Sequence, residues 1–322
     1  MYIDIFNGDA DGILSLVQLR KAFPVDKSDQ RLITGVKRDI ELCRQALNTQ
    51  NAQITVLDIS FDKNVNEVKS LVQENKVEYF DHHKADKLFQ HDNLSTHIDL
   101  SADICTALLV SKSINEKHHL WAIAAAYGDN LCQRAELESD KLNLTNLQRE
   151  QLKEFGILVN YNGYGASIED LHFHPADLYQ ELVKYDSPFD VIADESSCFH
   201  KLKKGFKDDD AKLSDLQAET KGAVYILKLP NQSWARRISG TIGNELANKY
   251  RDKAIVIATE KANSNYLISL RAPKDKQLGA SEICSKFPSG GGRAAAAGVN
   301  DLRFNELAGF VDSVNTFYTK DF

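Results

Sequence analysis

The chain has 322 residues, of which 43% are hydrophobic, with 39 Lys and Arg against 46 Asp and Glu and a formal net charge of −7. This composition is typical of a globular protein with about two domains, and it excludes a disordered or collagen-like chain. The negative charge also argues against a protein that binds long duplex nucleic acid through a broad basic surface, because each phosphate contact requires a Lys or Arg.

Neither a membrane partner nor a secretory signal is predicted. The longest nearly unbroken apolar run, residues 120–127, is far shorter than the roughly 20 residues that cross a bilayer, and the first residues lack a basic segment followed by an apolar one. We therefore expect a cytoplasmic protein. The five cysteines are widely spaced without a C-x-x-C pair, which predicts reduced, mostly buried thiols.

Short apolar segments alternate with helical periodicity over the first hundred residues. Strands are predicted at residues 2–6, 54–57 and 77–80, and helical patterns follow the first two. This alternation predicts βαβ crossovers and therefore an α/β domain with a mostly parallel, doubly wound sheet. Such sheets bind ligands beyond the carboxyl ends of their strands.

The rest of the chain predicts a core helix, a linker and a second, smaller α/β domain. Residues 108–131 have a very apolar helical pattern, whereas a block of charged residues near 201–210 is suited to a solvated linker. We place the first domain at residues 1–186, the linker at 187–220 and the second domain at 221–322. The second domain is predicted to contain strands at 223–229, 254–258 and 266–270 and helices at 242–250 and 304–318.

Aspartates follow the ends of four predicted elements in the first domain. They are Asp9 and Asp11 after the first strand, Asp58 after the second, Asp81 with His82 and His83 after the third, and Asp129 after the core helix. Carboxylates gathered in one crevice repel one another and need a compensating charge. Two divalent cations would balance Asp9, Asp11, Asp58 and Asp129, and oxygen ligands with one imidazole favour Mn²⁺ or Mg²⁺. Such a pair suits phosphoryl transfer.

Five sequence motifs in order resemble one known family. Residues 7–12 (Asn-Gly-Asp-Ala-Asp-Gly), 56–58 (Val-Leu-Asp), 81–83 (Asp-His-His) and 127–129 (Tyr-Gly-Asp) resemble the motifs of the DHH phosphoesterase superfamily. Residues 290–298 (Gly-Gly-Gly-Arg-Ala-Ala-Ala-Ala-Gly) resemble the glycine-rich signature of the DHH-associated domain that follows it. The superfamily includes RecJ-type exonucleases, nanoRNases and cyclic-dinucleotide phosphodiesterases, and the resemblance covers essentially the whole chain.

The resemblance implies a role for each motif residue in the first domain. Asp58 would bridge two metal ions, usually Mn²⁺. His82 and Asp129 with Asp11 would complete one metal site, and Asp9 with Asn7 the other. His83 would donate a hydrogen bond to the scissile phosphate, and Asp81 would orient the two histidines. A water molecule activated between the ions would then attack phosphorus.

This chain departs from the family pattern at two positions. The family often has His where this chain has Asn7 and where it has Arg293. An amide oxygen is a weaker ligand than imidazole, so we expect one metal ion to bind loosely and the protein to require excess Mn²⁺. Arg293 offers a planar cationic group to a terminal phosphate or a guanine edge, which favours a specialised substrate.

The second domain is predicted to hold the substrate. Its candidate binding residues are Arg271, which resembles the family's substrate-contacting arginine, and Gly290, Gly291, Gly292 and Arg293. A glycine run lets backbone N–H groups approach an anion closely. Holding the distal nucleotide there would limit substrates to about two to five nucleotides in length.

We therefore predict a metal-dependent phosphodiesterase that hydrolyses 5′-phosphorylated linear dinucleotides, pGpG-like, or very short oligonucleotides to 5′-mononucleotides by a two-metal mechanism. One alternative is a RecJ-type exonuclease on longer single strands, which would require a basic channel. Another is a catalytically weak nucleotide sensor, in which Asn7 marks a degraded metal site. A Trp234 side chain beside Arg236 and Arg237 could stack a base or seat a helix, whereas His172-x-His174 favours a surface role.

Overall fold

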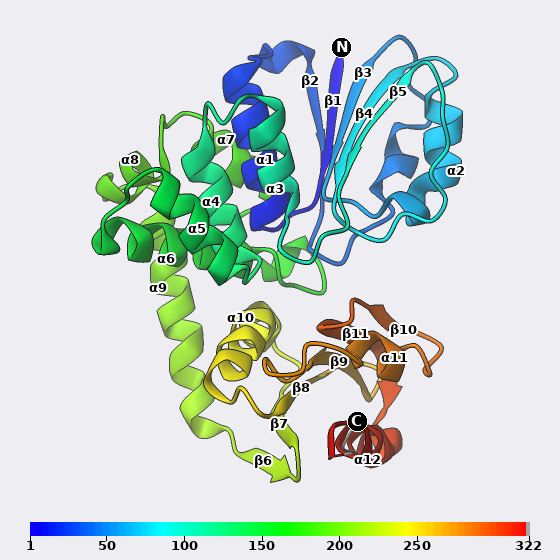
Figure 1. Ribbon diagram of the computed structural model, residues 1–322, viewed down its shortest axis with the longest axis vertical. Helices are drawn as coiled ribbons and strands as arrows, with labels where there is room; N and C mark the ends of the chain where they lie inside the picture. The colour runs from blue at the N-terminus through cyan, green and yellow to red at the C-terminus, as the bar shows by residue number, and fades with distance from the viewer. Residues whose placement is uncertain (320–322) are drawn as a thin grey trace. The chain divides into compact units, whose positions relative to one another are not determined.

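The structure is a computed structural model that describes residues 1–319. The chain divides into two compact units, Met1–Gly205 and Phe206–Phe322, and each contains one β-sheet with helices (Figure 1). The predicted α/β fold class is confirmed. Within residues 1–319, no helix combines the length and apolar composition needed to cross a membrane.

The sheet of the first unit has five parallel strands. They are β1 (Tyr2–Phe6), β2 (Gln30–Ile33), β3 (Gln53–Leu57), β4 (Lys76–Asp81) and β5 (Leu94–Ile98), in the order β2-β1-β3-β4-β5. The direction of winding reverses between β1 and β3, and Phe6, Leu57 and Phe80 pair side by side, so the three central strands end level. A crevice at such a reversal is the usual ligand site of an open α/β sheet.

Helices cover both faces of this sheet. Figure 1 shows α1, α3, α4 and α7 grouped on one side and α2 on the other. The apolar face of α2 packs Phe61, Val65 and Val68 against Ile54 and Tyr79 of the strands. The helices of the unit are α1 (Ala10–Ala22), α2 (Phe61–Leu71), α3 (Thr106–Ser113), α4 (His119–Gly128), α5 (Cys132–Lys141), α6 (Asn146–Asn162), α7 (Pro175–Leu182) and α8 (Pro188–Ala193).

The single helix predicted over residues 108–131 is wrong. The structure has two helices there, α3 and α4, with a break at residues 114–118. Asn115 and Glu116 have φ angles of 53° and 57°, a left-handed conformation that cannot continue a right-handed helix. The break gives α3 and α4 separate ends, and both ends matter for the site described below.

The predicted linker, residues 187–220, is largely helical. It contains α8, α9 (Cys198–Asp210), the 3₁₀ turn Ala211–Asp215 and the start of β6 (Ala218–Lys221). Phe199 and Leu202 of α9 are three residues apart and both are buried, so this helix has an apolar face although it is rich in charged residues. The boundary between the two units falls within α9, after Gly205.

The second unit has a mixed six-stranded sheet. Its strands are β6, β7 (Val224–Leu229), β8 (Ala254–Glu260), β9 (Asn265–Arg271), β10 (Gly290–Gly292) and β11 (Ala296–Arg303), in the order β10-β11-β9-β8-β7-β6. The pair β7 and β8 is parallel and the other neighbours are antiparallel. One face packs on α10 (Ser233–Lys249), and the other on α11 (Ala280–Cys284) and α12 (Leu307–Thr319).

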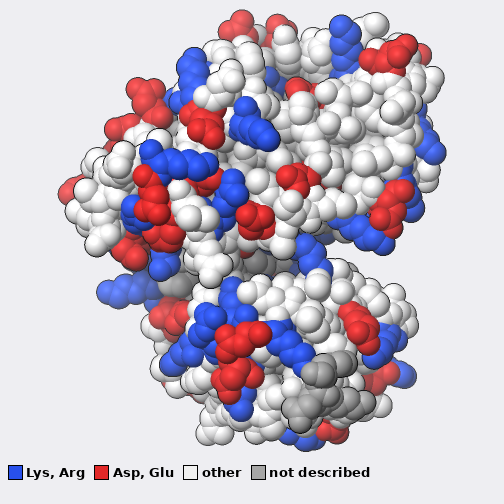
Figure 2. Space-filling model, in the orientation of Figure 1, with Lys and Arg blue, Asp and Glu red and all other residues white. Residues whose placement is uncertain are grey.

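The surface carries both signs of charge, and most of the cysteines are buried. Figure 2 shows basic and acidic side chains interspersed over the visible face of each unit. The five cysteines are free thiols, and Cys43, Cys105, Cys198 and Cys284 are buried while Cys132 is half-buried. The prediction of free, mostly buried thiols is confirmed.

Glycines allow three helices of the first unit to pack closely. A Cβ on Gly156 of α6 would lie 1.9 Å from the backbone oxygen of Ala124 in α4, and a Cβ on Gly128 would lie 2.7 Å from Cβ of Ala10 in α1. Neither distance is sterically allowed, so these glycines set the separation of α1, α4 and α6. The three helices carry polar residues of the site described below.

Replacing Gly156 with Ala should therefore force α4 and α6 apart. We expect Gly156→Ala to lower the free energy of unfolding by about 1–3 kcal/mol, the usual cost of overpacking a core. Glu150→Ala, an exposed change in the same helix, should stay within about 0.5 kcal/mol of the parent. Urea unfolding followed by circular dichroism checks both values, and equal stability of the two variants would contradict the packing argument.

Candidate metal centre

The level ends of three strands bring the motif residues to one edge of the sheet. Backbone pairing continues one residue beyond β1 and β3, since Asn7 N–H donates to Leu57 O at 3.1 Å and Asp58 N–H donates to Phe80 O at 3.0 Å. Asp58 has a φ of 58°, a left-handed conformation that few residues other than glycine adopt and that is concentrated at functional sites. The turn after β3 is therefore unusual at the residue predicted to bridge two metal ions.

Asp9 and Asp11 lie at the start of α1, and backbone N–H groups fix both carboxylates. Asp9 is the N-cap, and its Oδ1 accepts from the N–H groups of Asp11 and Gly12 at 3.0 and 3.1 Å. Asp11 accepts from the N–H groups of Thr106 and Ala107 at 2.8 and 2.7 Å. These two donors form the first turn of α3, so the helix end both orients and stabilises the Asp11 carboxylate.

His82 presents its Nε2 atom to two carboxylates. Its Nδ1 lies 2.8 Å from the carbonyl oxygen of Ile104, which can only accept a hydrogen bond, so Nδ1 carries the proton. Nε2 then lies 3.4 Å from Asp58 Oδ1 and 3.7 Å from Asp11 Oδ2. This backbone contact fixes the imidazole in the orientation typical of metal-binding histidines.

Asp81 and His83 form a separate pair beside this group. The Asp81 carboxylate is fully buried and accepts from the N–H groups of Phe61, His82 and His83, and its Oδ1 lies 2.6 Å from His83 Nδ1. Burial alone would lower the pKa of His83, but the hydrogen bond and charge of Asp81 raise it above its usual value. The arrangement leaves the other nitrogen of His83 able to donate to an anion.

Burial and mutual repulsion disfavour the charged form of the central carboxylates. Burial raises the pKa of Asp58 well above its usual value, and the charges of Asp11 and Asp9 raise it further. Burial is also the largest cause of the raised pKa of Asp11, to which Asp129, the C-cap residue of α4, and Asp9 contribute. A divalent cation would remove this penalty.

Lys37 is a residue of this site that the sequence analysis missed. It follows β2, and its ammonium group pairs with Asp9 Oδ2 and lies 3.6 Å from Asp129 Oδ1 and 3.4 Å from Asn160 Oδ1 of α6. Burial would lower the pKa of Lys37, but the charge of Asp9 raises it well above the usual value. One cation of the site is therefore supplied by the chain itself.

The remaining donors suit divalent cations. One ligand atom from each of Asp58, His82 and His83 lies within 4.8 Å of the others, although Asp81 already holds Nδ1 of His83. Asn7 is 4% exposed, and its Oδ1 accepts no hydrogen bond within residues 1–319. A buried oxygen without a donor, beside carboxylates and one imidazole, is the donor set that Mn²⁺ and Mg²⁺ bind.

The predicted substrate-binding residues lie at one end of the second sheet. Arg271, the last residue of β9, is level with Ala296 of β11 and donates to Asn244 Oδ1 at 2.9 Å and to Ser269 Oγ at 2.8 Å. Arg293 closes the turn between β10 and β11 through a 2.8 Å bond from its N–H to Ala296 O. The glycine run 290–292 forms edge strand β10, which pairs with residues 297–299 of β11.

Other candidates have structural roles. His172 Nε2 lies 2.7 Å from the Tyr161 hydroxyl, and His174 caps α7 by accepting from Ala176 N–H. Arg237 makes two bonds to Asp209, and Lys212 covers the Trp234 ring at 5.5 Å from its centroid. These contacts favour the interpretation that Trp234 seats the start of α10.

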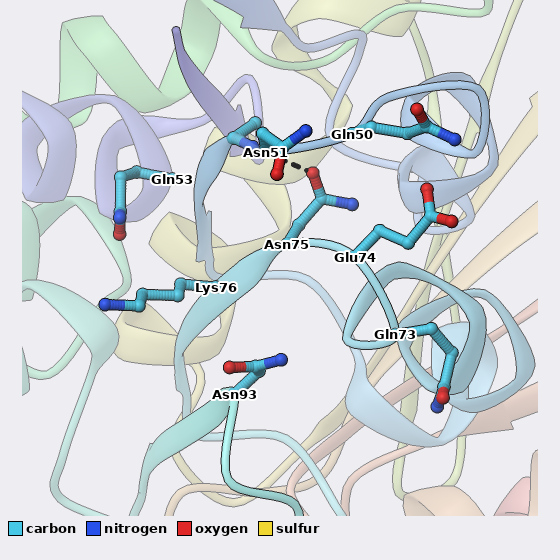
Figure 3. Close-up of a pocket in the computed structure, with 9 residues that line it drawn as sticks. Gln50, Asn51, Gln53, Gln73, Glu74, Asn75, Lys76 and Asn93 are labelled. Carbon is cyan, nitrogen blue, oxygen red and sulfur yellow. Dashed lines mark hydrogen bonds between the residues drawn. The ribbon is translucent and has the colours of Figure 1, made fainter.

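A cavity lies at the opposite edge of the first sheet, where β3 and β4 begin (Figure 3). Its volume is about 620 Å³. The lining is rich in side-chain amides. The amides of Asn75 and Asn93 already form hydrogen bonds with backbone groups of the same unit. The lining residues are Gln50, Asn51, Ala52, Gln53, Gln73, Glu74, Asn75, Lys76 and Asn93, and they include no residue of the carboxylate centre.

Comparison with known proteins confirms the resemblance that the motifs indicate. Residues 219–319 match the family model of the DHHA1 domain. No curated protein has a significant sequence match to the chain. The part of the second unit that spans residues 219–319 is therefore similar to the DHHA1 domain.

Solved structures of similar fold cover nearly the whole chain. They include the DHH domain of a member of a ribosomal-protein family, with a TM-score of 0.65 and 14% identity over 98% of this chain and 86% of that one. The pGpG-specific phosphodiesterase PggH from Vibrio cholerae has a TM-score of 0.56 and 12% identity, covering 99% of both chains. Exonuclease RecJ bound to manganese has a TM-score of 0.56 and 16% identity over 99% of this chain and 90% of that one. The chain thus shares its fold with these three structures.

The contact between Asp81 and His83 predicts a measurable change in titration. In metal-free protein, Asp81→Asn removes the charge that raises the pKa of His83 and leaves the burial that lowers it, so the pKa of His83 should fall. Imidazole resonances followed by NMR over pH measure the change. The exposed Asp177→Asn should leave the pKa of His83 unaltered, and an unchanged value in Asp81→Asn would contradict the assignment.

The raised pKa of Asp58 predicts how stability depends on pH. A carboxyl group whose folded-state pKa is raised contributes full stability at low pH and loses it as pH rises through that pKa. In EDTA, the free energy of unfolding of Asp58→Asn relative to the parent should therefore increase from about pH 4 to about pH 7. Denaturant titrations measure it, with Asp186→Asn, whose side chain is 99% exposed, as control. A difference that does not grow with pH would contradict the account.

Proposed function

We propose that the protein is a metal-dependent phosphodiesterase that hydrolyses 5′-phosphorylated linear dinucleotides, pGpG-like, or very short oligonucleotides to 5′-mononucleotides. The observation that carries the proposal is the convergence of Asp9, Asp11, Asp58 and His82 at the winding reversal between β1 and β3. The similarity to a pGpG-specific phosphodiesterase and to RecJ bound to manganese supports this reaction class. We propose two Mn²⁺ ions as cofactors, with Mg²⁺ as a substitute.

The family resemblance supplies the proposed ligand set. Asp11, His82 and Asp129 would hold one ion, Asp9 and Asn7 the other, and Asp58 would bridge them. When bound, such a pair lowers the pKa of a water molecule and neutralises charge on the phosphate. Excess Mn²⁺ should be required, because Asn7 offers an amide oxygen where imidazole is common.

Side chains of both units would bind the substrate, and His83 would donate a hydrogen bond to its phosphate. His83, with its raised pKa, is protonated over a wider pH range than a free histidine, so it can donate to a phosphate oxygen. Asp81 keeps the imidazole oriented through Nδ1. In the second unit, Arg271, the glycine strand 290–292 and Arg293 would bind the distal nucleotide, which would restrict substrate length.

Substrate length tests the proposal most simply. With Mn²⁺ and 5′-phosphorylated RNA of two, five and twenty nucleotides, kcat/KM should be highest for the dinucleotide, and EDTA should abolish turnover. Asp58→Asn should lower kcat/KM more than about a hundredfold, whereas Asp186→Asn should not change it. A panel of the sixteen 5′-phosphorylated dinucleotides then gives base preference.

Two outcomes would favour other functions. Faster turnover of the twenty-nucleotide strand would indicate a RecJ-type exonuclease. Binding of dinucleotides without cleavage in any divalent metal would indicate a nucleotide sensor. Either result rejects the proposal.

A further inference from the structure

Lys37 places a positive charge among the carboxylates of one half of the candidate metal centre. Its ammonium group pairs with Asp9 and lies 3.6 Å from Asp129 Oδ1 and 3.4 Å from Asn160 Oδ1. Asp9 and Asn7 are the two residues proposed above to bind the same metal ion. The ammonium group therefore contacts a ligand that this divalent ion needs.

The main chain of Lys37 is held on both sides, so this contact is built into the fold. Its N–H donates to Gly163 O at 2.8 Å, and its carbonyl oxygen accepts from Asn7 Nδ2 at 3.3 Å. The ammonium group also lies 5.4 Å from the centroid of the Tyr164 ring, and 25% of the side chain is exposed. The amide nitrogen of Asn7 therefore holds the main chain of Lys37 in place. The amide oxygen of Asn7 has no hydrogen-bond donor within residues 1–319 and is the atom proposed to bind a metal ion.

In the other half of the centre, Lys37 lies 3.6 Å from Asp129 but forms no ion pair with Asp11 or Asp58. Within residues 1–319, the ion pairs of Asp11 and Asp58 are formed with His82 and His83 and not with Lys or Arg. Both Asp11 carboxylate oxygens accept backbone N–H groups of α3, which orient the carboxylate but carry no net charge. The two halves thus differ in the charge that an incoming divalent ion would meet.

We propose that Lys37 competes with one divalent ion, so that the two ions bind with unequal affinity and in a fixed order. This inference rests on the proposed metal dependence. The first ion binds at Asp11, Asp58 and His82, none of which pairs with the Lys37 ammonium group. Asp129 would complete this site, and its contact with Lys37, at 3.6 Å, is longer than that of Asp9. The second binds at Asp9 and Asn7 only after the Lys37 ammonium group has left Asp9. Oδ1 of Asp9 already accepts two backbone N–H groups, and the ammonium group holds Oδ2 and would repel an approaching divalent ion.

Titration of metal-free protein with Mn²⁺ tests the proposal without any turnover. Free Mn²⁺ measured by electron paramagnetic resonance, together with calorimetry, should give one tight site and one site weaker by at least roughly tenfold. Lys37→Met keeps the length of the side chain and removes its charge, so the weaker site should tighten by about tenfold or more while the tight site changes little. Lys37→Arg retains a cation and should keep the two affinities unequal.

Controls separate the role of Lys37 from folding and from the proposed function. Lys63→Met, an exposed change in α2, should bind Mn²⁺ as the parent does. Lys37→Gln provides a second neutral variant if Lys37→Met unfolds at a much lower temperature than the parent. His82→Ala should remove the tight site, which verifies its location.

Several results would overturn the proposal. Two equally tight Mn²⁺ sites in the parent, or an unchanged weaker site in both neutral variants, would show that Lys37 does not compete. Weakening of that site in the neutral variants would show that Lys37 supports the ion. Absence of any Mn²⁺ binding in the parent and the variants would reject the proposed function and the inference together. Mn²⁺ binding that does not respond to the Lys37 substitutions would reject the inference alone.

Discussion

Repulsion among buried carboxylates is the constraint on which the site depends. Asp9, Asp11 and Asp58 are each at most 2% exposed, and burial and mutual charge raise the pKa of Asp11 and Asp58. A fold stabilises such a cluster only if other contacts hold the carboxylates in place, since the charges themselves oppose it. The protein provides these contacts from backbone N–H groups, from His82 and from Lys37, which leaves a geometry suited to divalent cations.

The architecture explains how residues from distant parts of the sequence reach one place. Parallel strands that end level deliver the residues after β1, β3 and β4 to one edge of the sheet. The first turn of α3 contributes two N–H donors to Asp11, and the end of α4 contributes Asp129. Glycines at 128 and 156 bring α1, α4 and α6 close enough for Asp129 and Asn160 to share the ammonium group of Lys37.

Much of this arrangement could be predicted from the sequence, because the strongest strands precede the motifs. The runs that became β1, β3 and β4 are strongly apolar and end directly before Asn7, Asp58 and His82. β2 has only four residues, two of them Gln30 and Arg31, and escaped prediction. Because β2 is parallel to β1, the segment after β2 reaches the same edge of the sheet as the segment after β1. Lys37 lies in that segment, so without β2 its place in the site could not be predicted.

The remaining errors also have physical causes. The apolar run around 108–131 hid a break, because left-handed residues at 115 and 116 have no signature in hydrophobic periodicity. The contact of His82 with Ile104 O involves a backbone atom, which any residue type could supply. Strand pairing of residues 290–292 depends on β11, so the glycines alone did not predict a strand.

The most direct measurement of the central claim is an anomalous difference map from crystals of the protein grown or soaked with Mn²⁺. The account predicts a peak within bonding distance of the carboxylates of Asp11 and Asp58 and of Nε2 of His82. Side chains of these three residues pointing away from one another, or a map without a peak between them at high Mn²⁺ concentration, would contradict it.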